Sequence, residues 1–170
     1  AVEANFLALA SLLGPGDEAW VQAPIYPQLP CVAAATGAAV RAWDLDPARL
    51  GPATRVAALN TPHNPTGVVA EVGAIAARVR SLPRAYLLVD EVYRGVGEAE
   101  PPPPALRALG PDRVLTSDST SKALALPGAR VGWLAGDAEA IRTGVVWREH
   151  TTLALAGPAV AAVKALWPHR

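Results

Sequence analysis

The stretch Tyr86-Leu87-Leu88-Val89-Asp90 sets four largely apolar residues in a row and ends on a carboxylate. A short, nearly continuous apolar run is typical of a strand that is buried on both faces, as at the centre of a parallel sheet. Similar runs recur along the chain on both sides of this one. The residues that we predict to form strands are 19–22, 39–43, 55–59, 86–89, 114–115 and 130–134.

The segments between these strands have the spacing of helices. Apolar residues recur at helical intervals over residues 1–13, and Gly14-Pro15-Gly16-Asp17 predicts the end of that helix. Strands that alternate with helices indicate an α/β fold of three α/β/α layers around a mostly parallel sheet. We expect residues 1–170 to form a single domain. Further helices are predicted over residues 32–35, 68–79, 138–150 and 154–166, and an extended surface loop over the proline-rich residues 98–104.

The composition narrows the range of partners and compartments. Lys and Arg number 15 and Asp and Glu number 15, so the net charge is zero and no basic face is expected for nucleic acid. No stretch approaches the roughly 20 apolar residues of a membrane span. The single cysteine, Cys31, has no partner for an internal disulfide and no neighbours at metal-ligand spacing. These features favour a cytoplasmic protein without a metal site.

Polar and aromatic residues follow several predicted strands at the edge where parallel sheets gather their ligands. Asp90 and Tyr93 follow the strand 86–89, Asn64 lies in the turn after 55–59, and Tyr26 lies in the loop after 19–22. Asp90 is suited to pair with a protonated ring nitrogen, and Tyr26 to stack on a planar ring. Each residue also has a simpler interpretation: a helix cap, a turn residue or a half-buried aromatic.

A lysine ends the polar stretch Ser117-Asp118-Ser119-Thr120-Ser121-Lys122, and an arginine, Arg130, follows eight residues after it. A lysine amine can condense with an aldehyde. The hydroxyl groups of Ser119 and Ser121, together with a guanidinium, suit a phosphate beside that aldehyde. Taken alone, a lysine in a serine-rich turn is more often an ordinary surface lysine.

Three segments together resemble the fold-type I, class I/II aminotransferases, which depend on pyridoxal phosphate. They occur in the order and spacing of that family, with matching Pro-Gly-Asp and Pro-x-Tyr segments upstream, and the resemblance covers nearly the whole chain. It implies the family's large, cofactor-binding domain as part of a longer chain, without the small domain. The segments are Asn60-Thr61-Pro62-His63-Asn64-Pro65-Thr66-Gly67, Val89-Asp90-Glu91-Val92-Tyr93, and Ser119-Thr120-Ser121-Lys122 with Pro127-Gly128-Ala129-Arg130-Val131-Gly132-Trp133.

The resemblance implies a role for each of these positions. Lys122 would form a Schiff base with pyridoxal 5'-phosphate and, once displaced by substrate, act as the catalytic base. Asp90 would bind the ring nitrogen. Ser121 and His63 would support the site without holding the cofactor. The other implied cofactor contacts are Tyr93 and Asn64 at the phenolic oxygen, Tyr26 on the ring face, and Ser119 and Arg130 at the phosphate, aided by the helix start at Ala1 and Val2.

The implied reaction transfers an amino group between an amino acid and a 2-keto acid in a homodimeric enzyme. Two alternatives share the same motifs. One is another pyridoxal-phosphate enzyme, namely a carbon–sulfur lyase, a decarboxylase or a cyclising synthase, because the fold does not decide among them. The other is a non-catalytic aminotransferase-like effector domain. A nucleotide-binding α/β domain is disfavoured, because no glycine-rich phosphate-binding motif follows a strand.

Overall fold

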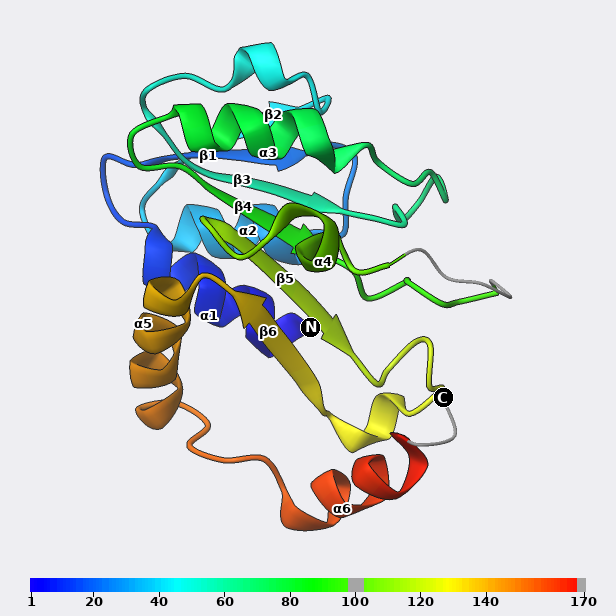
Figure 1. Ribbon diagram of the computed structural model, residues 1–170. Helices are drawn as coiled ribbons and strands as arrows, with labels where there is room; N and C mark the ends of the chain where they lie inside the picture. The colour runs from blue at the N-terminus through cyan, green and yellow to red at the C-terminus, as the bar shows by residue number, and fades with distance from the viewer. Residues whose placement is uncertain (98–102, 168–170) are drawn as a thin grey trace.

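The computed structural model describes residues 1–97 and 103–167, which contain a six-stranded sheet in the order β2-β1-β3-β4-β5-β6 (Figure 1). All neighbouring strands are parallel except β5 and β6, which are antiparallel. The mostly parallel α/β sheet predicted from the sequence is therefore confirmed. The strands are β1 (Glu18–Gln22), β2 (Ala39–Trp43), β3 (Thr54–Asn60), β4 (Tyr86–Asp90), β5 (Val114–Ser119) and β6 (Gly132–Gly136).

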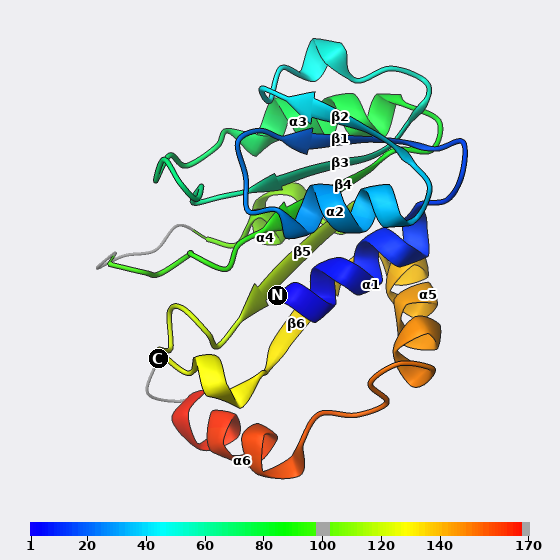
Figure 2. The same cartoon turned by 180° about the vertical axis from the view of Figure 1, so that it is seen from behind.

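Helices cover both faces of this sheet (Figures 1 and 2). One face carries α1 (Val2–Leu12), α2 (Gln28–Ala35) and α5 (Ala138–Glu149), with α5 packed along α1. The other carries α3 (Val72–Ser81), α4 (Ala105–Leu109) and the 3-10 helix η1 (Pro47–Arg49). The last helix, α6 (Gly157–Leu166), contacts the 3-10 helix η2 (Pro127–Ala129).

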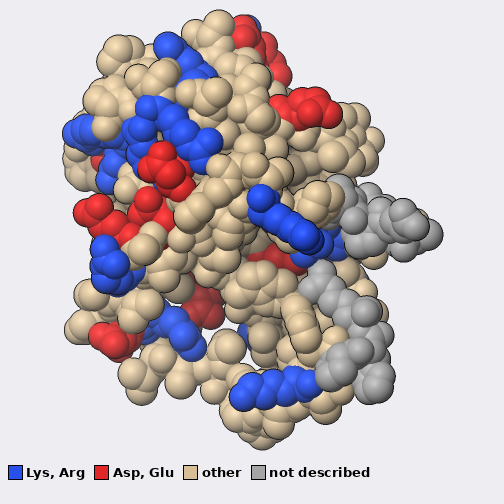
Figure 3. All heavy atoms as spheres, in the orientation of Figure 1, with Lys and Arg blue, Asp and Glu red and all other residues tan. Residues whose placement is uncertain are grey.

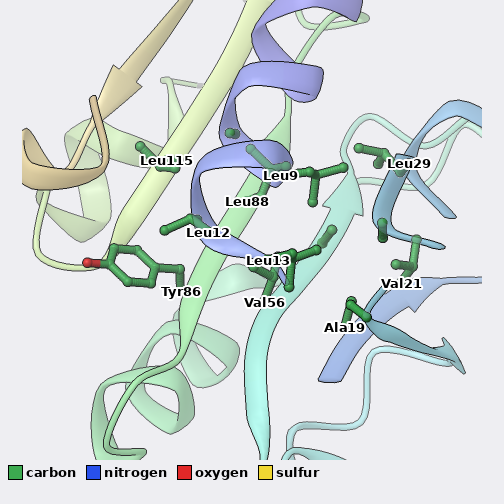
Figure 4. Close-up of a cluster of buried hydrophobic side chains, with 14 of the residues drawn as sticks. Leu9, Leu12, Leu13, Ala19, Val21, Leu29, Val56, Tyr86, Leu88 and Leu115 are labelled. Atoms are coloured by element: carbon green, nitrogen blue, oxygen red, sulfur yellow. The ribbon is translucent and has the colours of Figure 1, made fainter. Parts of the chain in front are cut away.

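The residues of β4 before Asp90 are largely apolar because both faces of this central strand are buried. Leu88 points toward the α1 face, whereas Leu87 and Val89 pack on the α3 face, and all three are fully buried. Figure 4 shows Leu9 and Leu12 of α1 beside Leu88 and other side chains of the sheet. Because side chains alternate along the strand, β4 contributes to the hydrophobic core on each face of the sheet. The packing of Leu88 against Leu9 and Leu12 holds α1 across the centre of the sheet.

The helix predicted over residues 68–79 begins four residues later, at Val72. The amide of His63 donates to the carbonyl of Val68 at 2.9 Å, and the amide of Ala70 donates to the hydroxyl of Thr61 at 2.9 Å. These bonds hold residues 68–70 against the preceding turn, so the prediction was wrong there.

Other boundaries also move. The strand predicted at 130–134 lies at Gly132–Gly136, because Arg130 adopts a left-handed conformation after η2. The helix α2 begins four residues before the predicted 32–35, and α6 begins at Gly157 rather than at residue 154. The sequence did not predict α4. Of the predicted proline-rich loop, residues 98–102 lie outside the described residues. Within residues 1–97 and 103–167, no helix is both long and apolar enough to cross a bilayer.

Gly136 permits the close approach of β6 to β5. Its φ is +138°, and a Cβ added there would lie 1.9 Å from the carbonyl oxygen of Val114. We expect Gly136→Ala to lower the free energy of unfolding by roughly 2–4 kcal/mol, because the backbone must move or strain. Urea unfolding measures this loss. Gly51→Ala is the matched control: its Cβ meets open space, so a similar loss there would contradict the explanation.

Candidate active site

Strand register brings three polar residues to the carboxyl edge of the sheet. Asn60 at the end of β3 lies opposite Asp90 at the end of β4, and Asp90 lies opposite Ser117 on β5. The amide of Thr61 and the side-chain amide of Asn60 both donate to the carbonyl oxygen of Asp90, each at 2.9 Å. The sheet therefore fixes the backbone of Asp90 from the neighbouring strand.

The carboxylate of Asp90 is held by donors from two sides. The amide of Val92 donates to its Oδ1 at 3.0 Å, and the Nδ2 of Asn5, on α1, donates to its Oδ2 at 2.8 Å. Burial raises the pKa of this carboxyl above its ordinary value of 3.8, while the hydrogen bonds from Asn5 and Val92 act in the opposite direction. Each carboxylate oxygen has two acceptor positions, so a further donor can bind.

The turn after β3 carries Asn64 toward Tyr93. The Oδ1 of Asn60 accepts from the amide of Asn64 at 2.8 Å, and the Nδ2 of Asn64 donates to the Tyr93 hydroxyl at 3.2 Å. The ring nitrogens of buried His63 lie 2.8 Å from the hydroxyl of Thr66 and 2.7 Å from a backbone carbonyl in the loop after β1. His63 thus connects this turn to the loop after β1.

Lys122 lies three residues beyond the end of β5, in a turn attached to the start of β6. The amide of buried Thr120 donates to the carbonyl of Val131 at 3.1 Å, and the carbonyl of Thr120 accepts from Leu126 at 3.0 Å. The Lys122 Nζ lies over the Tyr93 ring, 5.4 Å from its centroid. The lysine therefore reaches back to the aromatic residue that follows β4.

The predicted phosphate-binding residues lie on the same side of this turn. Ser119 is the last residue of β5 and is buried, and its Oγ accepts from the amide of Ser121 at 3.3 Å. Ser119 is therefore part of a strand, not of a serine-rich turn. Arg130 is exposed, and its Nη1 donates to the carbonyl of Pro127 at 2.8 Å. This bond holds the guanidinium group beside the loop that carries Lys122.

One cavity of about 270 Å³ joins most of these side chains. Eight of the nine residues predicted to hold the cofactor line it. Asn64 does not line it and reaches it through the Tyr93 hydroxyl. An amine, a carboxylate, a guanidinium and hydroxyl groups thus surround a single space. The eight residues are Ala1, Val2, Tyr26, Asp90, Tyr93, Ser119, Lys122 and Arg130.

Sequence reasoning missed Asn5, Gln28 and Asn60, which also line the cavity. A signal for Asn5 was present: it is a polar residue four positions before Leu9, on the face of an otherwise apolar helix that packs on the sheet. Gln28 has no comparable signal, since it follows a tyrosine and proline in a loop. Its contribution depends on where α2 lies.

A larger cavity, of about 700 Å³, lies on the other side of Ser119 and Arg130, between α1, β6 and α5. Its lining is mostly apolar and includes Phe6, Leu7 and Ile141. The reactive side chains Asp90, Tyr93 and Lys122 belong to the smaller cavity, which we take as the chemical site. On the face drawn in Figure 3, basic and acidic side chains are interspersed, so that face has no extended positive surface.

The family model for aminotransferase class I and II matches residues 1–166. Capreomycidine synthase of Streptomyces vinaceus is 35% identical, over 96% of this chain and 45% of the synthase. An aspartate/prephenate aminotransferase of Cereibacter sphaeroides is 32% identical, over 94% of this chain and 44% of that enzyme. The crystal structure of a PLP-dependent aminotransferase from Streptococcus suis has a TM-score of 0.87 at 27% identity, covering 98% of this chain and 47% of that one. The chain spans less than half the length of these relatives.

Because the pKa of Asp90 is raised in the folded protein, we expect this residue to lower the stability of the fold as the pH rises. A carboxyl whose pKa is higher in the folded state contributes its stability fully below the unfolded value of 3.8, and that contribution is lost as pH rises through the folded value. Asparagine does not titrate. We therefore expect Asp90→Asn to gain stability relative to the wild type as the pH rises from about 4 to 7, as measured by urea unfolding without added ligand.

The control is Asp112→Asn, because the Asp112 side chain is 70% exposed and pairs with Arg80 at the surface. Its stability relative to the wild type should change little over the same pH range. If the Asp90→Asn difference is constant with pH, burial does not raise the pKa of Asp90.

Proposed function

Because the chain belongs to the class I and II aminotransferase family, we propose that its site binds pyridoxal 5'-phosphate and transfers an amino group between an amino acid and a 2-keto acid. Lys122 is the residue that holds the cofactor covalently. The observation that carries the proposal is the cavity shared by Lys122, Asp90 and Arg130. These three side chains supply an amine, an anion and a cation around one space.

The donor set of the cavity fits this cofactor. Asp90 keeps an acceptor position for a protonated ring nitrogen, and Arg130 with Ser119 provides a cation and a hydroxyl for the phosphate. Tyr93 and Asn64 are hydrogen-bonded to each other, and the tyrosine hydroxyl can donate to the phenolic oxygen. Tyr26 is 60% exposed and lies at the cavity wall, where its ring can cover that of the cofactor.

Bound pyridoxal phosphate supplies an electron sink for the charge that develops at the substrate α-carbon. The chain's residues fix the geometry and protonation around it. Ionised Asp90 keeps a proton on the ring nitrogen. The Lys122 Nζ, when it is not bound to the cofactor, would take the proton from the α-carbon of the amino acid. The Tyr93 ring below this nitrogen limits where the lysine can move.

The substrates of the whole protein are proposed from its relatives. Relatives at 32–33% identity include an aspartate/prephenate aminotransferase and the arginine–pyruvate transaminase of Pseudomonas aeruginosa. Both names specify amino-group transfer, so we propose an amino acid and a 2-keto acid as substrates. A homodimer as the working form stays a proposal that rests on the family resemblance. The second candidate is a synthase on the same scaffold, favoured by the 35% identity with capreomycidine synthase.

Removal of Lys122 should abolish the covalent link to the cofactor. Within residues 1–170 the lysines are Lys122 and Lys164, so a borohydride-trapped adduct in this part of the protein has two possible lysine sites. In the full-length protein we expect Lys122→Ala to lose the trapped adduct and the visible absorption of the bound cofactor, and to lower transfer at least about 100-fold. Mass spectrometry of tryptic peptides locates the adduct.

Lys164→Ala is the matched control, since Lys164 lies on α6 and does not line the cavity that contains Lys122. It should keep both the adduct and the activity. An adduct that persists in Lys122→Ala would refute the proposed role of this lysine.

Product analysis separates transfer from the other reactions. A transaminase needs a 2-keto acid to regenerate the cofactor, so amino-acid consumption without an acceptor should stop after about one turnover per site. Adding a keto acid should restore continuous turnover and yield a new amino acid. Continuous turnover without an acceptor would favour a lyase, decarboxylase or cyclising synthase, and cofactor binding without turnover would favour an effector domain.

A further inference from the structure

Asn5 is a buried polar residue in a helix that otherwise packs apolar side chains on the sheet. It is 1% exposed, and Leu9, one turn further along α1, is fully buried in the same core. Burying an amide costs free energy unless its donors and acceptor find partners. A leucine has a similar branched shape and would pack in this place without that cost, so packing does not explain an asparagine here.

The side chain of Asn5 connects α1 with two strands. Its Oδ1 accepts from the Ser117 hydroxyl on β5 at 2.6 Å, and its Nδ2 donates to the Asp90 carboxylate at the end of β4 at 2.8 Å. Both of these hydrogen bonds are made to residues at the carboxyl edge of the sheet. The contact with Asp90 spans 85 positions of sequence.

The direction of these hydrogen bonds is set by Gln28 on α2. The Nε2 of Gln28 donates to the carbonyl oxygen of Val2 at 2.5 Å, and a backbone carbonyl can only accept. The Oε1 of Gln28 must therefore face the other way, toward the Nδ2 of Asn5 at 3.4 Å. This arrangement keeps the amino group of Asn5, and not its oxygen, next to Asp90.

We propose that Asn5, oriented by Gln28 and Ser117, is a positioning residue that aims Asp90 at the ring nitrogen of pyridoxal phosphate and keeps that carboxyl ionised. The inference rests on the proposed function, because it assigns a role toward the same cofactor. A carboxylate that has lost its proton can hold the ring nitrogen protonated, whereas a protonated carboxyl group cannot.

The electrostatics of Asp90 support this role. Burial raises its pKa, and the hydrogen bond from Asn5 is the largest of the contributions that lower it. A smaller contribution comes from the amide of Val92. Lys122 and Arg130 are the other charged side chains that line the cavity with Asp90. Asn5 therefore does most to offset the loss of water around the carboxylate.

The first test measures Asp90 directly in the cofactor-free protein. Carbon NMR of 13C-labelled aspartate follows the titration of its carboxyl carbon, and Asp90→Asn assigns the signal. We expect Asn5→Leu, which keeps the branch at Cγ but removes both polar atoms, to raise the pKa of Asp90 further. Gln28→Ala, at a half-buried and more tolerant position, should raise it in the same direction by less, and serves if Asn5→Leu does not fold.

The second test measures the cofactor. With 15N-labelled pyridoxal phosphate bound to the full-length protein, the nitrogen shift should report a protonated ring in the wild type and a partly deprotonated ring in Asn5→Leu. Cofactor affinity should fall roughly tenfold or more, as for the loss of one hydrogen bond to a charged group. Thr36→Val, which removes a hydroxyl bonded within α2 at 2.7 Å, controls for a general loss of stability and should change neither signal.

The outcomes separate this inference from the function on which it rests. A wild type that binds no cofactor refutes the proposed function, and with it the role of Asn5 toward the ring. A wild type that binds cofactor, with unchanged Asp90 titration and ring-nitrogen shift in both Asn5→Leu and Gln28→Ala, overturns the role of Asn5 alone.

Discussion

The contacts around the site depend on one constraint: a carboxylate stands at the end of a buried central strand, β4. β4 fills both cores of the sheet with Leu87, Leu88 and Val89, and its next residue is Asp90. The strand must be buried to hold the layers together, and its burial removes water from the carboxylate that follows. Such a group persists only where hydrogen-bond donors replace the lost water.

Two separate parts of the chain meet that requirement, and a third holds the backbone of the same residue. Asn5 of α1 and the amide of Val92 donate to the carboxylate, and Asn60 of β3 donates to the carbonyl of the same residue. The contacts that stabilise the carboxyl edge are therefore the contacts that shape the cavity. A helix, a strand and a turn are placed relative to one another by a single residue, which couples the geometry of the site to the packing of the core.

The same arrangement explains why the family identity is clearer than the reaction. The binding and orientation of a pyridoxal ring that we propose for Asp90, Lys122 and Arg130 would serve any reaction type on this scaffold equally. Relatives of similar identity include both aminotransferases and a capreomycidine synthase. The choice of reaction depends on which substrate bond is aligned with the ring, and the chain spans less than half the length of those relatives.

The sequence by itself determined the mostly parallel α/β sheet and the family, because runs such as 86–89 and the segments around Asn64, Asp90 and Lys122 are local patterns. Local patterns did not determine where residues 68–71 lie, because hydrogen bonds to Thr61 and His63 override their helical spacing. Nor did they reveal that Asn5 contacts Asp90 across 85 positions. Only the tertiary structure decided these features, since it brings together donors and acceptors that no sequence spacing relates.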